Sequence, residues 1–188
     1  MDWDDNAFDE YYEEEPEMST TIVYLRGPVK WAKVFEGNRD KGKYAPADGQ
    51  YAIDIGLTDK DLKQVKTWNR LYTGKKYPKI HKAYEPGDSK LTYICFKRKH
   101  KHFKVDGETV IEEWSGAPAI LDEDGDDWDN GFIGNGSVCT VKLDVTTVEG
   151  KTYVRLEGIR VEEHVEFEST NEPKEPAKED NRTKGLPF

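Results

Sequence analysis

The chain has 188 residues, of which 35% are hydrophobic and 35% are charged, so it has room for one domain with tails but not for two large cores. No apolar run approaches the roughly 20 residues that a membrane helix needs. The acidic N-terminus is also unlike the basic and then apolar start of a secretory signal. We therefore expect a soluble, cytoplasmic protein without a membrane partner.

The net charge of −10 conceals a strongly basic middle section. Residues 26–104 hold 20 Lys and Arg against 8 Asp and Glu, whereas residues 1–18 hold 9 acids and no base, and residues 105–129 hold 10 acids and no base. The basic section also contains 11 of the 22 aromatic residues. Cations interleaved with rings favour a single nucleic-acid strand as partner, because its phosphates attract charge and its unpaired bases stack on flat surfaces.

Composition divides the chain into three segments. Residues 1–19 form an acidic arm without a sustained helical or strand period, and repulsion between its like charges favours a flexible arm. Residues 20–168 are expected to fold as one β-rich domain. Residues 169–188 form a polar tail, which we also expect to be flexible.

The domain begins with two stretches that are typical of β-strands. Residues 20–35 are rich in β-branched and aromatic side chains, and Gly27-Pro28 interrupts them where we expect a bend or a bulge. After this point, alternation predicts that four residues share one face: Val29, Trp31, Lys33 and Phe35. A long basic, glycine-rich loop leads to residues 50–57, whose alternation predicts a second, half-buried strand with these inward side chains: Tyr51, Ile53, Ile55 and Leu57.

A helix and a basic hairpin follow. Apolar residues recur at helical spacing from about Asp59 to Tyr72, and Trp68 lies on this apolar stripe, so we expect it to pack against the core. Residues 90–105 then meet residues 108–114 across Asp106-Gly107, a dipeptide that favours a type I′ hairpin turn. The positive charge along residues 97–104 is too dense for a core, so the hairpin is expected to protrude.

The last part of the domain reads as another hairpin. Residues 137–148 and 151–167 alternate between apolar and polar side chains and flank Glu149-Gly150, which predicts a tight turn. Five or more strands with one helix describe a mainly β fold. We expect an OB-fold, a five-stranded Greek-key barrel, because its strand faces and loops commonly bind single strands.

Several of these segments resemble a known protein family. The sequence VYLRGPVKWAKVFEGN, the strand QYAIDIGL, and IGNGSVCTVKLDV with the strand after it are similar to the single-stranded DNA-binding proteins of tailed bacteriophages. The resemblance covers residues 20–168, and its most specific part is the run from Ile133 to Ser137. It implies an OB-fold protein in the host cytoplasm that coats and protects single-stranded DNA during phage replication, recombination or repair.

The chain departs from this family at its ends. Relatives often carry an acidic C-terminal tail with an aromatic last residue, whereas here the acids lie in the N-terminal arm and in an internal loop. The final Pro187-Phe188 is still similar to the tail tip with which bacterial single-stranded DNA-binding proteins dock partner proteins. The resemblance therefore implies that Pro187 and Phe188 contact replication proteins.

The candidate DNA-binding residues are the cations and rings of the basic section. Those expected to pair with phosphates are Lys30, Lys33, Arg39, Lys41, Lys43, Lys75, Lys76, Lys79, Lys97, Arg98, Lys99, His100 and Lys101. Those expected to stack on bases are Trp31, Phe35, Tyr44, Tyr77, Phe96 and Phe103. The alternative for each cation is a solvated surface group, and the alternative for each ring is packing in the core.

Other chemistry finds little support in the sequence. The run Gly134-Asn135-Gly136 lacks phosphate-loop spacing and predicts a tight turn with positive φ. Three alternate acids between Asp122 and Asp129 have calcium-loop spacing but lack its glycine and its final glutamate. Cysteines and histidines show no zinc pattern, and no nucleophile is paired with a base, so we predict neither a cofactor nor an enzyme. Cys95 and Cys139 are expected to be buried free thiols.

Two hypotheses concern the acids. Aromatic and acidic residues alternate in the N-terminal arm as rings and charges do along a DNA strand, so the arm is expected to occupy the basic surface until DNA displaces it; the alternative is a solvated tail. A second function class also stays open, a DNA mimic or replication scaffold that acts through the acidic arm and loop. The sequence does not choose between a monomer and a dimer.

Overall fold

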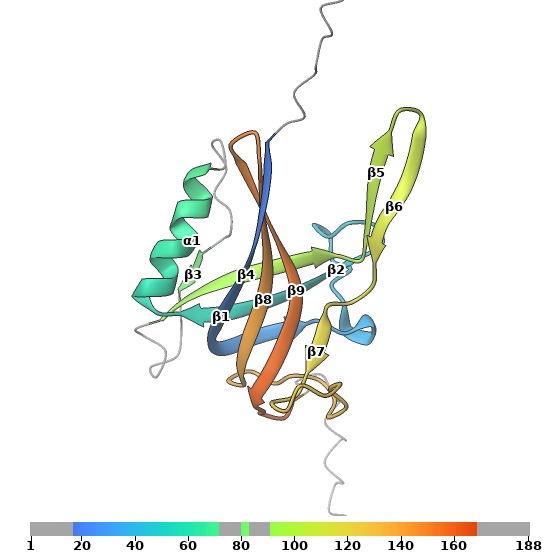
Figure 1. Cartoon of the computed structure of the whole chain (residues 1–188). Helices are drawn as coiled ribbons and strands as arrows, with labels where there is room; N and C mark the ends of the chain where they lie inside the picture. The colour runs from blue at the N-terminus through green and yellow to red at the C-terminus, as the bar shows by residue number, and fades with distance from the viewer. Residues whose placement is uncertain (1–16, 72–79, 83–90, 169–188) are drawn as a thin grey trace, which may run out of the picture.

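The computed structural model describes residues 17–71, 80–82 and 91–168. These residues form nine strands, one α-helix and one short 3-10 turn (Figure 1). In chain order they are β1 (Met18–Lys33), the 3-10 turn η1 (Glu36–Asn38), β2 (Gln50–Leu57), α1 (Asp59–Leu71), β3 (Ile80–Lys82), β4 (Thr92–Lys99), β5 (Lys101–Asp106), β6 (Thr109–Ser115), β7 (Ala119–Leu121), β8 (Val138–Val148) and β9 (Lys151–Glu163). None of the helical segments in these ranges is long and apolar enough to span a membrane.

Seven strands form one curved sheet, and β1 belongs to both halves of it. The strand order is β3-β4-β2-β1-β8-β9-β7, while β5 pairs with β6 alone. Residues Met18 to Pro28 of β1 pair with β8, and the register with β2 begins at Val29. Figure 1 shows β1 turning sharply, so that β8 and β9 cross over β2 and β4. The five central strands enclose the core, and the predicted mainly β OB-type fold is confirmed.

The bend in β1 lies at Gly27-Pro28, as the sequence predicts. A Cβ atom at Gly27 would lie 2.1 Å from the carbonyl oxygen of Gly56 on β2, so only glycine permits this approach of the two strands. Pro28 has no N–H group to pair, and the ladder with β8 ends at this residue. The two residues together let one strand leave its first partner and join the second.

The core lies between the two crossing halves of the sheet. The predicted inward residues of β2 are all at most 1% exposed: Tyr51, Ile53, Ile55 and Leu57. Trp68 of α1 is 8% exposed, which confirms its predicted place against the core. The helix begins at the predicted residue and is described to Leu71, whereas Tyr72 lies outside the described residues.

The second half of β1 does not alternate as expected. Its register with β2 shifts between Lys30 and Lys33, which marks a bulge. Trp31 lies in this bulge with a φ of 49°, so Val29 points into the core while Trp31 is half exposed. The predicted shared face of Val29, Trp31, Lys33 and Phe35 is therefore wrong, because one extra residue changes the phase of a strand.

Both predicted hairpins are present. The long basic strand breaks at His100, so that β4 stays in the barrel while β5 and β6 form a separate hairpin that protrudes in Figure 1. Its turn is not type I′, because Gly107 alone has positive φ, at 61°, which fits type II′. In the second hairpin Glu149 and Gly150 both have positive φ, as a type I′ turn requires.

Candidate nucleic-acid interface

A row of lysines crosses the outer surface of three neighbouring strands. Lys33 of β1 lies opposite Ala52 of β2, and Ala52 lies opposite Lys97 of β4. Directly opposed residues of an antiparallel ladder project from the same side of the sheet. Because the neighbouring Ile53 points into the core, this row points outward, and both lysines are exposed. In the next row Lys99 lies opposite Gln50.

The loop from residue 34 to residue 49 is tied to the start of β2 beside this row. Asp40 accepts hydrogen bonds from Gln50 Nε2 at 3.0 Å and from the Gly42 amide at 3.0 Å, and its Oδ1 lies 3.8 Å from Lys33 Nζ. The Gln50 and Gly42 hydrogen bonds hold the pKa of Asp40 below its ordinary value, so this carboxylate is ionised at neutral pH. These hydrogen bonds therefore hold Asp40 in place at the base of the loop segment that contains Lys41, Lys43 and Tyr44.

Three predicted contact residues project from this loop. Lys41 and Lys43 are exposed, and Tyr44 is 91% exposed, with Lys43 Nζ 5.6 Å from its ring centroid. A tyrosine this exposed contributes little to packing. We use the name basic face for the following set: Lys33, Lys41, Lys43, Tyr44, Lys97 and Lys99.

Two predicted contact residues, Lys30 and Phe96, are buried, so they lie outside the exposed surface. Phe96 is 0% exposed and belongs to the core, opposite the buried Ile53 of β2. Lys30 is 6% exposed, and its Nζ lies 4.9 Å from the Tyr93 ring centroid. Lys30 lies opposite Asp54 of β2, on the same side of the sheet as Lys33, but its side chain is covered there.

Phe35 and Arg39 also make internal contacts. The Phe35 ring packs on the core, and its centroid lies 5.5 Å from that of Phe132, so the side chain is not presented with Trp31 as expected. Arg39 is half-buried, and its Nε atom is buried without a hydrogen-bond partner. The predicted contact of these two side chains with DNA stays a prediction.

Arg98 and His100 connect elements of the barrel. Arg98 donates hydrogen bonds to the Gly116 carbonyl at 3.1 Å and to Glu157 Oε1 at 3.3 Å, and its side chain is only 10% exposed. Burial lowers the pKa of Arg98, and the nearby Glu157 opposes that shift. His100 Nδ1 lies 2.7 Å from the Tyr51 hydroxyl. Both side chains make contacts within the protein, and their predicted contact with DNA stays a prediction.

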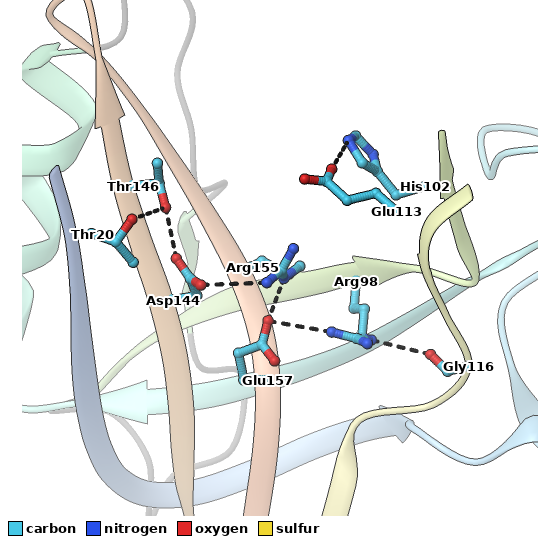
Figure 2. A network of polar contacts seen from close by, with 9 residues as sticks. All are labelled: Thr20, Arg98, His102, Glu113, Gly116, Asp144, Thr146, Arg155 and Glu157. Carbon is cyan, nitrogen blue, oxygen red and sulfur yellow. Dashed lines mark hydrogen bonds and ion pairs between the residues drawn. The ribbon is translucent and has the colours of Figure 1, made fainter. Parts of the chain in front are cut away.

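Figure 2 shows that Arg98 belongs to a network joining β4, β8 and β9. Arg155 of β9 pairs with Glu157 and also with Asp144 of β8, at 3.3 Å for the latter. The ring of Trp114, from β6, lies against both guanidinium groups, with its centroid 4.5 Å from Arg98 and 4.8 Å from Arg155. The Arg98–Glu157 pair therefore connects β4 with β9. The contacts of Trp114 with the two arginines anchor the base of the β5–β6 hairpin at the same place.

The rest of the predicted hairpin residues lie beyond this anchor. Lys101 is half-buried, and Phe103 is 47% exposed on β5. Both residues follow Lys99 along the chain, on the far side of the break between β4 and β5 at His100. They stay candidates for contact with a strand that extends from the basic face to the hairpin.

No family model and no curated protein matches the sequence. Among solved structures, gp2.5, a single-stranded DNA-binding protein encoded by bacteriophage T7, is 16% identical over 84% of this chain and 92% of that chain, with a TM-score of 0.48. The single-stranded DNA-binding protein from bacteriophage Enc34, in complex with single-stranded DNA, is 8% identical over 79% and 89%, with a TM-score of 0.49.

A C-terminal truncation of the Enc34 protein is 9% identical over 78% of this chain and 88% of that chain, with a TM-score of 0.50. The chain shares the fold of this phage single-stranded DNA-binding protein. The resemblance inferred from the sequence is thus confirmed at the level of the fold.

Some predicted sites lie outside the described residues. They are the loop residues Lys75, Lys76, Tyr77 and Lys79, and the C-terminal Pro187 and Phe188. These assignments stay predictions.

The predicted glycine turn is confirmed. Gly136 has a φ of 93°, and a Cβ atom at Gly134 would lie 2.3 Å from the Glu166 carbonyl oxygen. Asn135 between them accepts a hydrogen bond from the Trp31 amide at 2.8 Å. Neither this contact nor the Trp114 anchor was predicted, because nothing in local sequence indicates which distant segment an exposed asparagine or tryptophan meets.

The acidic loop lies away from the hairpin, at the lower end of the barrel in Figure 1. Asp122 Oδ1 accepts hydrogen bonds from the amides of Asp124 and Asp126, each at 2.9 Å. Within the described ranges, no group of three His, Cys, Asp or Glu side chains is arranged to hold a metal ion. Burial raises the pKa of both Cys95 and Cys139 to about 12, and both are free thiols. Cys139 is buried as predicted, whereas Cys95 is half-buried.

Proposed function

We propose that the chain binds single-stranded DNA without sequence preference, with its phosphates on the basic face. The observation that carries this proposal is the outward row Lys33–Ala52–Lys97, with Lys99 in the row beside it. Strand spacing places the Cα atoms of Lys33 and Lys97 about 10 Å apart, and those of Lys97 and Lys99 about 7 Å apart. The residue between the two lysines, Ala52, has a short side chain.

The position of this face in the barrel supports the proposal. OB-folds commonly bind oligonucleotides on the face of their second and third strands and on the loop between the first two strands. In the present barrel β2 and β4 take these places, and the loop with Lys41, Lys43 and Tyr44 joins β1 to β2. The phage protein whose fold the chain shares is a single-stranded DNA-binding protein.

The proposal predicts a definite salt dependence. Five lysines of the basic face, each pairing with one phosphate, give a slope of about −3.5 in log K against log salt for a single strand. Affinity should then fall roughly 100-fold between 50 and 200 mM salt. The test is a titration of labelled oligo-dT and of a duplex of equal length at several salt concentrations. Absence of oligo-dT binding at 50 mM salt, or equal affinity for the duplex, would overturn the proposal.

We further propose that this binding protects exposed strands during phage DNA replication, recombination or repair, as the family resemblance implies. The alternative is a DNA mimic or replication scaffold, and the observation that favours it is the ordered acidic loop away from the hairpin. The same titration separates the two functions. A DNA mimic would bind a nuclease or polymerase and leave oligo-dT free at 50 mM salt.

A further inference from the structure

Trp31 has a backbone conformation that a tryptophan rarely adopts. Its φ is 49°, and Glu149 is the other non-glycine residue with positive φ among the described residues. Glu149 lies in a two-residue hairpin turn that requires this conformation. Trp31 instead lies in the bulge of β1, where glycine or asparagine would adopt the same backbone with less strain.

The loop between β7 and β8 holds this bulge in place. The Val29 amide donates a hydrogen bond to the Ser137 carbonyl at 2.8 Å, and the Gly136 amide donates to the Val29 carbonyl at 2.9 Å. Two residues after Val29, the Trp31 amide donates a hydrogen bond to Asn135 Oδ1 at 2.8 Å. Residues 135–137, just before β8, thus continue the hydrogen bonding of β1 beyond the ladder with β8. The Asn135 side chain provides the hydrogen-bond acceptor for the amide of the strained residue Trp31.

The Trp31 ring is presented to solvent beside the basic face. The residue is 50% exposed, although burying a ring of this size would be strongly favourable. Lys30 Nζ lies 6.0 Å from the Trp31 ring centroid, and Lys33, at the far end of the bulge, begins the open row of lysines. The strained backbone conformation therefore places the Trp31 ring next to the proposed path of the phosphates.

We propose that Trp31 is a stacking platform for one unpaired nucleobase and that Asn135 is the residue that positions it. This inference rests on the proposed function and adds a specific base-binding position to it. Strained backbone conformations persist where the surrounding structure over-determines them, and they gather at functional sites. A ring that is already fixed in its binding conformation loses little conformational entropy when a base stacks on it. More of the stacking free energy is then available for affinity.

The binding test uses paired variants of the full chain. Trp31→Gly and Trp31→Ala both remove the ring, and each should weaken oligo-dT binding by roughly 5- to 100-fold, the range for one base stacked on an aromatic side chain. The salt slope should not change, because no phosphate contact is lost. Trp31→Phe should bind within a few-fold of the wild type but show less quenching of tryptophan fluorescence. Trp128→Phe is the matched control and should retain the quenching.

The stability test addresses the strain directly. In an ordinary strand, alanine is more stable than glycine. At a residue with positive φ the order is reversed, so Trp31→Gly should melt at a higher temperature than Trp31→Ala, by about 2–4 °C. Asn135→Ala should lower the quenching amplitude and the affinity while the salt slope stays the same, because it acts through the position of the ring.

The outcomes separate this inference from the proposed function. If the wild type does not bind oligo-dT, the proposed function fails. If the wild type binds and Trp31→Gly binds equally well, the stacking position is wrong and the basic face still stands. If the loss of affinity follows a large fall in melting temperature in both variants, Trp31 is a packing residue instead.

Discussion

Three consecutive basic residues on β4 have different roles because the strand is pleated. Lys97 and Lys99 point outward, whereas Arg98 points inward and contacts Glu157 and Trp114. Successive side chains of a strand alternate between its two faces. A run of cations in the sequence therefore divides into a ligand-facing group and a structural group once the strand is placed in the barrel.

This division predicts opposite effects for neighbouring substitutions. Lys97→Gln should reduce the magnitude of the salt slope by about 0.7 and leave the melting temperature unchanged, because one phosphate contact is lost from an exposed residue. Arg98→Gln should instead lower stability by about 1–3 kcal/mol, since it removes charged hydrogen bonds at a largely buried position. Salt titrations and thermal melts measure the two effects. Lys63→Gln on the exposed side of α1 is the control, and a slope change of equal size there would contradict the assignment.

At the scale of elements, the bend of β1 permits one strand to serve both halves of the sheet. It depends on the close approach of Gly27 to Gly56 and on the missing N–H of Pro28. Gly27→Ala should destabilise the fold by about 3 kcal/mol or more, because the new methyl group meets backbone atoms that cannot move aside. Denaturant unfolding measures this loss. Gly37→Ala meets its nearest atom at 3.7 Å and should change stability little; similar losses in both would disprove the steric account.

The β5–β6 hairpin depends on its anchor to the barrel. A two-stranded hairpin is marginally stable alone, and Trp114 holds it against Arg98 and Arg155. Trp114→Ala should lower hydrogen-exchange protection of β5 and β6 by roughly 10-fold or more, because two cation–π contacts are lost. Protection of β2 should stay the same.

Trp114→Phe is the matched control for this anchor. The Nε1 atom of Trp114 is buried without a hydrogen-bond partner, so phenylalanine loses no hydrogen bond and should retain most of the hairpin protection. If Trp114→Ala leaves the exchange of β5 and β6 unchanged, the hairpin is stable without its anchor.

At the scale of the whole molecule, the described charges are separated along the barrel. The basic face lies on β1, β4 and the loop between β1 and β2, whereas the acidic loop joins β7 to β8 at the opposite end from the hairpin (Figure 1). The N-terminal arm holds further acids with no base. An acidic segment attached to a basic surface competes with DNA by charge alone, which is the physical basis of the hypothesis that the arm occupies this surface.

Removing residues 1–16 tests that hypothesis without cutting into β1, which begins at Met18. Oligo-dT affinity at 50 mM salt should rise by severalfold, about 10-fold at most, because eight acids are lost. The gain should shrink as salt rises, since screening weakens the competition. A chain of full length with these acids changed to Asn and Gln should behave like the deletion. Equal affinity of wild type and deletion at low salt would show that the arm does not compete.

Particular residues show how far the sequence could predict this structure. Alternation in β2 identified its buried face, and helical spacing identified Trp68, because these patterns reflect contact with one continuous core. The same reasoning failed at Trp31, since a bulge shifts the phase and leaves no clear mark in composition. It also failed at Lys30 and Phe96, which lie in a basic and aromatic stretch yet are buried.

The sequence by itself determined the fold class, the bend of β1, the two hairpins and the basic character of the middle section. Each depends on local features: the period of apolar residues, the conformations open to glycine and proline, and the sorting of charge. Only the tertiary structure decided which cations face outward, what anchors the hairpin, and why Trp31 is held half exposed beside Lys33. These depend on contacts between segments far apart in the chain, such as Trp31 with Asn135, which no local pattern specifies.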